Sequence, residues 1–297
     1  MNRARAHAGV RTTEAEGIRG RLLAGTPVSQ RWLSLAGHST AVLEGGQGPP
    51  LVLLHGAGEF AATWIRVIPE LVRTHRVIAP DLPGHGSSQL GSEPLDARTV
   101  TAWLGELIER TCPSPPALVG HLLGGAIASR FAIGRPDRLS RLVLVDTYGL
   151  GRLWPTPRYA LAMLAFVARP TESAQERLYR QCVFDLDGLR EQMGERGRLM
   201  EAYALDRARN PGMNAALKHL MRQIGVPATP PAELARIAVP ATLIWGRHDR
   251  QVRLALAEAA STRYGWPLHV IDRAADDPAV EQPEAFLQAL YAGLGGS

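Results

Sequence analysis

Short apolar segments alternate with helical patterns along most of this chain. The predicted strands lie at 51–55, 76–79, 116–120, 141–145, 241–245 and 267–271. The predicted helices lie at about 60–73, 97–111, 124–134 and 281–292, and an antiparallel pair of strands is expected within 32–43. Strands that alternate with helices in this way favour a mostly parallel sheet covered on both faces, which defines an α/β fold.

The alternation stops after Tyr148, where apolar residues begin to recur at helical intervals. We expect a helical cap over 149–226 that lies across the carboxyl ends of the strands, where open α/β sheets bind ligands. The segments 28–148 and 227–297 would then form the core. Residues 1–27 are rich in arginine and lack the apolar run of a secretory signal, so they are expected to form a flexible, loosely docked extension.

The basic charge balance does not indicate a nucleic-acid partner. The net charge is +5 and the pI about 9.7, but Lys218 is the only lysine, and the arginines are interspersed with acids rather than gathered into a basic run. No apolar stretch reaches the ~18 residues of a membrane span. Cys112 and Cys182 form no disulfide or metal pattern, so we expect a cytoplasmic protein without metal or cofactor. The oligomeric state is left open.

Residues 116–128 have the pattern of an apolar strand, a sharp turn flanked by glycines, and the start of a helix. The turn reads GHLLG over 120–124. In a G-x-S-x-G turn of this kind, the central serine is lifted above the sheet as a nucleophile. Here the central residue is Leu122, which has no lone pair, no proton to give and no charge. The pattern predicts the backbone of a nucleophile elbow without the atom that attacks.

Four further segments lie in a fixed order around this turn: LVLLHGAG at 51–58, RVIAPDLPGHGS at 76–87, TLIWGRHD at 242–249 and EQPEAF at 281–286. Together with the turn they resemble the α/β-hydrolase superfamily over nearly the whole chain. The resemblance implies an α/β-hydrolase fold, with a mostly parallel twisted sheet, helices on both faces and a helical cap insertion.

The resemblance also implies an uneven set of catalytic positions. Asp249 occupies the position of the catalytic acid, but Asp276 stands where the family carries its histidine, and no histidine follows His269. The oxyanion hole of the family is made by two backbone N–H groups, which correspond here to Ala57 and Leu123. Backbone donors survive side-chain changes, so this part of the site is expected to remain.

Each altered position has a functional and a purely structural interpretation. Leu122 is either an apolar floor for a substrate or a position that has drifted. Asp249 is either a carboxylate facing the pocket or, slightly favoured, the ion-pair partner of Arg247, Arg250 or Arg273. Asp276 either forms a carboxylate pair with Asp249, in which one pKa must rise, or belongs with Asp277 to a solvated acidic loop.

Other candidates line or support the expected pocket. Glu59 is placed at the pocket mouth, where glutamates are often only solvated, and Tyr148 and Trp154 are expected in the pocket wall. Cys182 is a remote candidate for a displaced nucleophile, although a buried structural thiol is the better interpretation. Three histidines lie in the motifs above and are expected to support turns rather than to catalyse: His55, His85 and His121.

These residues lead us to expect a non-hydrolytic, cofactor-independent enzyme. It would act on an apolar, carbonyl-bearing small molecule by cyclisation, isomerisation or elimination, as in natural-product biosynthesis. The oxyanion donors and acid–base help from Asp276 would suffice, because such reactions need positioning and charge stabilisation but no covalent intermediate. Two alternatives remain open. One is a small-molecule-binding protein without turnover, and the other is a weak hydrolase with a relocated nucleophile, such as Cys182 or an activated water.

Overall fold

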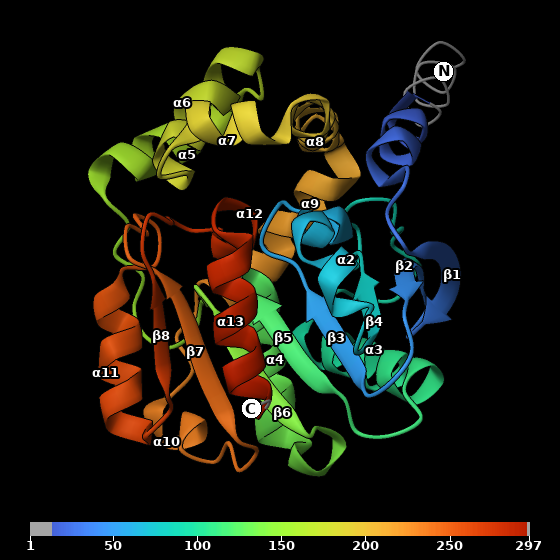
Figure 1. The fold of residues 1–297 in the computed structure, drawn as a ribbon, viewed down its shortest axis with the longest axis vertical. Helices are drawn as coiled ribbons and strands as arrows, with labels where there is room; N and C mark the ends of the chain where they lie inside the picture. The colour runs from blue at the N-terminus through green and yellow to red at the C-terminus, as the bar shows by residue number, and fades with distance from the viewer. Residues whose placement is uncertain (1–13, 296–297) are drawn as a thin grey trace.

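The computed structural model describes residues 14–295 and contains an eight-stranded sheet with helices on both faces (Figure 1). The strand order is β1-β2-β4-β3-β5-β6-β7-β8. Strand β2 is antiparallel to both of its neighbours, β1 and β4, and the strands from β3 to β8 are parallel to one another. The bounds are β1 (Ser29–Leu35), β2 (His38–Gly45), β3 (Pro50–Leu54), β4 (Arg76–Pro80), β5 (Ala117–His121), β6 (Arg141–Val145), β7 (Ala241–Gly246) and β8 (Leu268–Ile271). The predicted α/β-hydrolase architecture is confirmed.

Successive side chains of the central strands point to opposite faces of the sheet, and because most of them are apolar, helices cover both faces. In β3, Val52 and Leu54 pack with α3, α4 and α11, whereas Leu51 and Leu53 pack on the opposite face with η1, α2 and α13. Because both faces are buried, these strands are continuously apolar. The core helices are η1 (Ala61–Arg66), α2 (Ile68–Leu71), α3 (Ala97–Thr111), α4 (Leu122–Gly134), η2 (Pro136–Arg138), α10 (Pro231–Leu234), α11 (Leu254–Tyr264), α12 (Pro278–Glu281) and α13 (Pro283–Leu294).

The helix expected over about 60–73 is divided into two short pieces. A 3₁₀ segment, η1, ends at Arg66, and α2 begins at Ile68. Pro69 lies at the start of α2 and has no N–H to donate to the preceding turn, so one continuous α-helix cannot pass through this position. The apolar face is still buried as expected, with Trp64 and Leu71 in the core.

The insertion between β6 and β7 forms a helical layer over the carboxyl ends of the strands (Figure 1). Its helices are α5 (Pro157–Ala168), α6 (Glu172–Cys182), α7 (Leu186–Met193), α8 (Glu195–Ala208), α9 (Pro211–Leu220) and a π-helical turn, η3 (Met221–Gly225). Side chains that accept hydrogen bonds from the first-turn amides begin four of them: Thr156, Thr171, Asp185 and Asn210. Such caps satisfy N–H groups that a helix leaves without partners.

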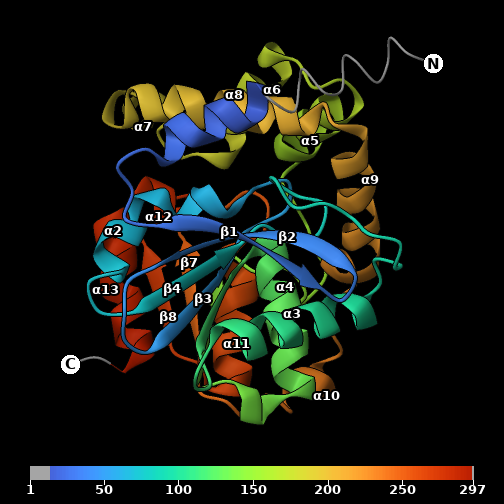
Figure 2. The same cartoon turned by 90° about the vertical axis from the view of Figure 1, so that its right-hand side faces the viewer.

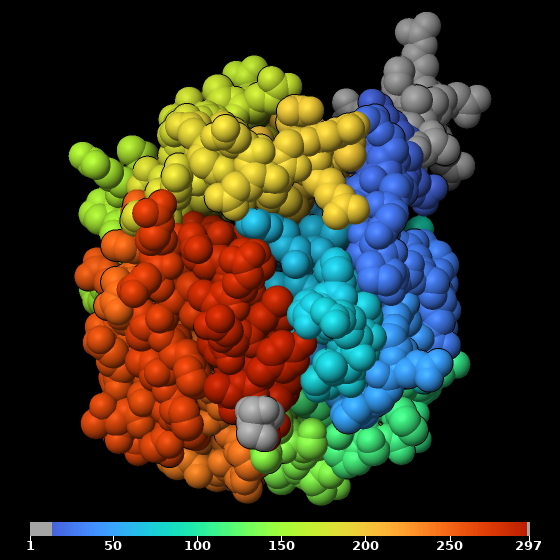
Figure 3. All heavy atoms as spheres, in the orientation of Figure 1, coloured from blue at the N-terminus to red at the C-terminus, as the bar shows by residue number. Residues whose placement is uncertain are grey.

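Part of the expected flexible extension is a docked helix. Residues 14–23 are helical and lie against α8 (Figures 2 and 3). Leu22 is fully buried in a cluster with Phe60 and Tyr203, and Arg19, only 3% exposed, forms a 3.0 Å salt bridge with the buried Asp81. The helix therefore connects the cap to the core, and loose docking is wrong for this segment. Residues 1–13 lie outside the described residues.

None of the helices within residues 14–295 combines the length and apolarity needed to cross a bilayer.

Candidate active site

The turn after β5 has the backbone of a nucleophile elbow. Leu122 has a φ of +44°, in the left-handed region that side chains with a Cβ rarely adopt. A Cβ placed on Gly120 would lie 2.5 Å from the carbonyl oxygen of Gly124, and one on Gly124 would lie 2.5 Å from that of Leu54. Only glycine fits at these two positions, so the sharp turn is built into the packing of β3 against β5 and α4.

The strained turn is also held from the neighbouring strand. The carbonyl oxygen of Leu122 accepts hydrogen bonds from the backbone N–H of Tyr148 and the hydroxyl of Thr147, each at 3.2 Å. These donors lie just beyond β6, so the two strand ends are tied together above the sheet. The side chain of Leu122 is 3% exposed and forms part of the pocket lining.

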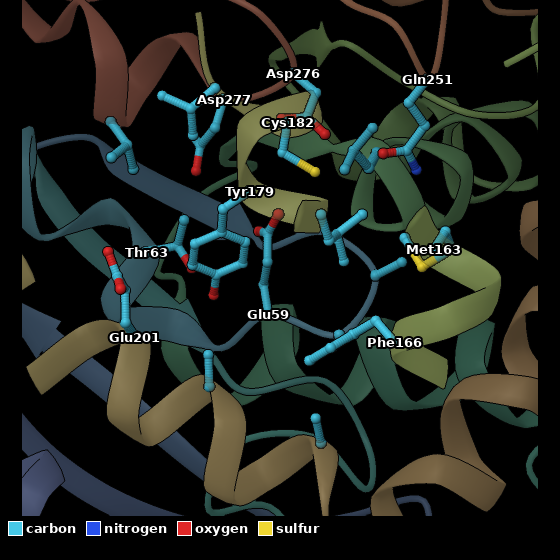
Figure 4. Close-up of a pocket in the computed structure, with 18 of the residues that line it drawn as sticks. Glu59, Thr63, Met163, Phe166, Tyr179, Cys182, Glu201, Gln251, Asp276 and Asp277 are labelled. Atoms are coloured by element: carbon cyan, nitrogen blue, oxygen red, sulfur yellow. The ribbon is translucent and has the colours of Figure 1, made fainter. Parts of the chain in front are cut away.

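A cavity of about 460 Å³ lies between the elbow and the cap (Figure 4). Most of its wall is apolar, with side chains from α5, α6, α8 and α9 above and Leu122 below. Its polar side chains include Glu59, Thr63, Cys182, Gln251, Asp276 and Asp277. Pockets with an apolar body and a few polar groups are typical of small-molecule sites.

The structure places most of the expected site residues at this cavity. Ala57, Glu59, Leu122, Tyr148 and Asp276 all belong to its lining. The side chain of Leu123 is fully buried beneath the elbow, and its amide lies in the first turn of α4, where a helix supplies no acceptor.

Trp154 does not line the pocket, so this expectation is wrong. Its side chain is 59% exposed, and the Arg152 guanidinium lies 4.3 Å from the centre of its ring. Its neighbours Leu153 and Pro155 face the cavity instead. In an extended segment, neighbouring side chains point in opposite directions. Without a regular apolar pattern, the sequence does not indicate which of them face the pocket.

Asp276 is a buried carboxyl with few donors around it. It is 6% exposed, and its backbone N–H donates to the carbonyl oxygen of Cys182 at 3.1 Å. Burial raises the pKa of Asp276 well above its usual range, and the negative charge of Asp249 raises it further. Figure 4 shows its carboxyl group next to the Cys182 thiol. The alternative of a solvated acidic loop does not fit this degree of burial.

Asp249 lies behind the pocket lining and makes no ion pair with an arginine within the described residues. Its Oδ1 accepts the backbone N–H groups of Gln251 and Val252 at 2.6 and 2.8 Å, whereas Oδ2 is buried without a partner. Burial raises the pKa of Asp249 to about 7 against the effect of these two donors. The ion-pair interpretation is therefore wrong. Arg247, one of the expected partners, pairs with Asp272 instead.

Asp146 is a buried acid that the sequence analysis did not single out. It follows β6 directly, is fully buried, and accepts the Gly246 N–H at 2.9 Å with one oxygen while the other has no partner. Burial, then the nearby Asp249, raise its pKa well above the usual range. The signal that could have found it is its place at the carboxyl end of a parallel strand, where functional groups of α/β folds gather.

The buried His121 and the partly exposed Glu59 form an ion pair beside the pocket. Nδ1 of His121 lies 3.1 Å from the Glu59 carboxylate, and Nε2 faces the backbone carbonyl oxygen of Asp276. Both ring nitrogens therefore face acceptors, which only the imidazolium can satisfy. Burial alone would lower the pKa of His121, but Glu59 raises it well above 6.5. His121 thus supports the turn, as expected, and also carries a buried positive charge.

Cys182 is a poor candidate for a displaced nucleophile. It belongs to the pocket lining at the end of α6, but burial and the neighbouring Asp276 raise the pKa of its thiol well above 9. The thiolate, which is the reactive form, is therefore disfavoured. The other acid in this region, Glu281, accepts the N–H groups of Ala275 and Phe184 at 2.7 and 2.6 Å and fixes the loop that carries Asp276.

Comparison with known proteins identifies the family. The model of the alpha/beta hydrolase family matches residues 51–289, so the chain belongs to this family. It is 29% identical over 270 residues to the pimeloyl-acyl-carrier-protein methyl ester esterase of Aeromonas hydrophila, covering 86% of this chain and 100% of that protein. It is 30% identical over 241 residues to 2-hydroxymuconate semialdehyde hydrolase of a Pseudomonas species, covering 77% and 80% of the two chains.

Solved structures share the fold. The carboxylesterase CesB of Bacillus subtilis superposes with a TM-score of 0.80 at 20% identity, covering 97% of this chain and 99% of that one. The 2-hydroxy-6-oxo-6-phenylhexa-2,4-dienoate hydrolase of a Rhodococcus species gives a TM-score of 0.78 at 24% identity, covering 91% and 99%.

The relatives contradict the expected non-hydrolytic function. They are named as esterases and hydrolases, which points to hydrolysis rather than to cyclisation, isomerisation or elimination. The expectation failed because it treated the loss of the serine as the loss of hydrolysis. Hydrolysis by an activated water molecule needs no nucleophilic side chain.

Proposed function

We propose that this protein hydrolyses esters of apolar acids with a water molecule that is activated by Asp276. The observation that carries the proposal is the position of Asp276, a buried carboxyl in the pocket lining at the place of the family's histidine. The family relationship supports hydrolysis, and the largely apolar cavity of about 460 Å³ supports an apolar substrate.

The reaction needs no covalent intermediate with the protein. The ionised Asp276 takes a proton from water while the water oxygen attacks the ester carbonyl. The N–H groups of Ala57 and Leu123 donate to the oxyanion of the tetrahedral intermediate. When the intermediate collapses, the carbon–oxygen bond of the leaving alcohol breaks, and the Asp276 carboxylic acid returns its proton to that alcohol.

The electrostatics of the site favour a base of this kind. A carboxylate whose pKa is raised by burial binds a proton more strongly than an exposed one, so it removes a proton from water more readily. The same shift restricts the ionised form to higher pH. We therefore expect kcat/KM to rise with pH through the titration of Asp276.

The test uses p-nitrophenyl esters of medium-chain and aryl-alkyl acids. Asp276→Asn should lower kcat by about 10²-fold or more, the usual contribution of a general base, and should abolish the rise of kcat/KM with pH. Asp272→Asn is the matched control, because Asp272 lies in the same loop but its side chain is 74% exposed. Cys182→Ala should retain activity if the thiol is not the nucleophile.

Labelled water separates this mechanism from one in which a carboxylate of the protein is the nucleophile. In a single turnover in H₂¹⁸O with enzyme in excess, the label should enter the product acid and no peptide of the protein. A fluorophosphonate should not label the protein, because Leu122 offers no hydroxyl. Unchanged kinetics for Asp276→Asn, label in the protein, or no ester turnover by the wild-type protein would each contradict the proposal.

A further inference from the structure

We propose that the substrate carries an ammonium group, which binds at the acidic end of the pocket beside Asp276 and Asp277. This inference rests on the proposed function, because it names the substrate class of the same site. It follows from the charges at that end of the pocket and from one carboxyl without a matching donor.

The acidic end of the pocket is built from two segments of the chain. Asp276 and Asp277 come from the loop after β8, and Glu59 comes from the turn after β3 (Figure 4). All three side chains belong to the lining of one cavity. Apolar side chains make up most of the remaining wall, so a bound molecule would have an apolar body and one end among carboxyl groups.

Within the described residues no cation forms an ion pair with Asp276. The His121 imidazolium is paired with Glu59, although its charge also acts on Asp276 and Asp277, and the Arg66 guanidinium acts on Asp277. Arg190 also borders the cavity but forms salt bridges with Glu176 and Glu201. Lys218 belongs to the lining from α9, and its side chain is exposed.

Asp276 differs from the other buried acids in its lack of donors. Asp249 and Glu281 each accept two backbone N–H groups. Within the described residues the carboxyl oxygens of Asp276 accept no backbone N–H and no arginine, and the one side chain that donates to them is the weakly donating thiol of Cys182. A buried polar group is normally hydrogen-bonded, so this carboxyl, 6% exposed and directed into the cavity, lacks a donor that a ligand can supply.

An ammonium group matches these requirements better than other polar groups. It provides three donors and no acceptor, and its charge is opposite to that of the carboxylates. A substrate carboxylate would be repelled by Glu59, whose ionised form is stabilised by His121. A hydroxyl group could donate one hydrogen bond but would leave the charge of an ionised Asp276 without compensation.

A bound ammonium group would also favour the ionised form of Asp276, which is the form that acts as the proposed base. In the empty pocket, burial and the acids Asp249, Glu281 and Asp277 favour the neutral form of Asp276, and His121 opposes them. The groups that face this carboxyl from the neighbouring elements are Cys182, Tyr148, Tyr159, Asp146, Asp249, Asp277, Glu281, Glu59 and His121. An incoming cation reverses the balance, so Asp276 ionises and releases its proton as the ligand binds.

Calorimetry with three matched probes tests the inference without turnover. The probes are 4-phenylbutylamine, 4-phenylbutan-1-ol and 4-phenylbutanoate, which share one apolar body and differ in the terminal group. We expect the amine to bind at least about tenfold more tightly than the alcohol, as charge-assisted hydrogen bonds allow, and the carboxylate to bind most weakly. The amine is fully protonated near neutral pH.

The sharper readout is the proton released on binding. Titrations in two buffers with different ionisation enthalpies should show that the protein releases a proton on binding the amine, and none on binding the alcohol. Asp276→Asn should abolish both the release and the preference for the amine, while Asp272→Asn should retain both. The thermal unfolding temperature of Asp276→Asn without ligand serves as the control for folding.

Several results would overturn the inference. They are equal affinities for amine and alcohol, tighter binding of the carboxylate, no proton release, no binding of any probe, or a preference that persists in Asp276→Asn. These results concern equilibrium binding, so they are separate from the kinetic test of hydrolysis. If ester turnover depends on Asp276 but the amine is not preferred, only the substrate class is wrong.

Discussion

The elbow at 120–124 and the loop at 274–281 have changed in opposite ways relative to a serine hydrolase. The elbow retains the backbone geometry of a nucleophile turn, with two glycines in close contact, but carries an apolar side chain at its centre. The loop lacks the expected histidine but contains three acids, Asp276, Asp277 and Glu281, at or near the pocket. The comparison shows that the backbone geometry of this site can be retained while the chemistry of its side chains changes.

The physical reason lies in what each region must do for folding. The elbow backbone is packed between β3, β5 and α4, so its shape is required by the core, whatever its central side chain does. The loop is fixed mainly by Glu281, which accepts two amides, and by the backbone hydrogen bond between Asp276 and Cys182. Its cavity-facing side chains are therefore free to change without loss of the fold, as is common for functional loops.

The largest predicted effect tests whether the elbow is required for folding. In Gly124→Ala, the new methyl group would lie 2.5 and 2.6 Å from the carbonyl oxygens of Leu54 and His55, which are backbone atoms that cannot move aside. We expect the free energy of unfolding to fall by about 3 kcal/mol, at the upper end of the usual cost of overpacking. Urea unfolding followed by circular dichroism measures it.

Gly134→Ala is the matched control, because Gly134 ends the same helix and has no atom within 4 Å of the added Cβ. It should be neutral or slightly stabilising, since alanine favours helix. If Gly124→Ala were as mild as this control, the elbow backbone could adjust to the added methyl group, and its shape would not be required by the core.

The sequence predicts the fold well because the buried strands are short, apolar and regularly spaced. All six predicted parallel strands lie within one residue of those observed at both ends, and the strand predicted at 141–145 coincides with β6. The predicted helix at about 60–73 failed at Pro69, where local backbone chemistry overrides an otherwise correct apolar pattern. The segment at 14–23 was missed because its burial depends on distant partners, such as the contact of Arg19 with Asp81.

The site was less predictable, since its properties depend on which way side chains face and on what lies behind them. Motif positions directed attention to Asp249 and Asp276, but not to Asp146, which no motif marked. The ion pair between His121 and Glu59 joins the last residue of β5 to the turn after β3, and no spacing in the sequence indicates it. The composition of the segment around Trp154 did not indicate which of its side chains face the pocket.

The second predicted effect is a change in the free energy of unfolding with pH, which arises from the buried carboxyl of Asp249. Burial raises the pKa of Asp249 from 3.8 to about 7, so between about pH 4 and 7 the folded state holds a proton that the unfolded state has lost. Stability should therefore fall as pH rises through this window, by up to about 1.4 kcal/mol per pH unit for one group. Urea unfolding at several pH values measures the slope.

Asp249→Asn should flatten this slope, because its side-chain oxygen can still accept the N–H groups of Gln251 and Val252 while the titration is removed. Asp137→Asn is the control, since Asp137 lies outside the cluster on η2. The raised pKa of His121 acts in the same direction at higher pH, because its contribution is fully present below about 6.5 and is lost as pH rises through the folded value. A slope unchanged by Asp249→Asn would mean that another buried acid holds the proton.

The smallest predicted effect is the most direct test of the comparison: Leu122→Ser alone should give no measurable reaction with a fluorophosphonate. Below the raised pKa of Asp276 the hydroxyl would stand on a suitable backbone, but the neutral carboxyl could not accept its proton, whereas a histidine could. The double change Leu122→Ser with Asp276→His supplies both groups, and Asp249 is already in the acid position. Stoichiometric labelling of the double variant, but of neither single variant, would show that the elbow kept its geometry after losing its nucleophile. Labelling of Leu122→Ser alone would mean that Asp276 can activate a serine, and an inert double variant would mean that the loop no longer brings position 276 within reach of the elbow.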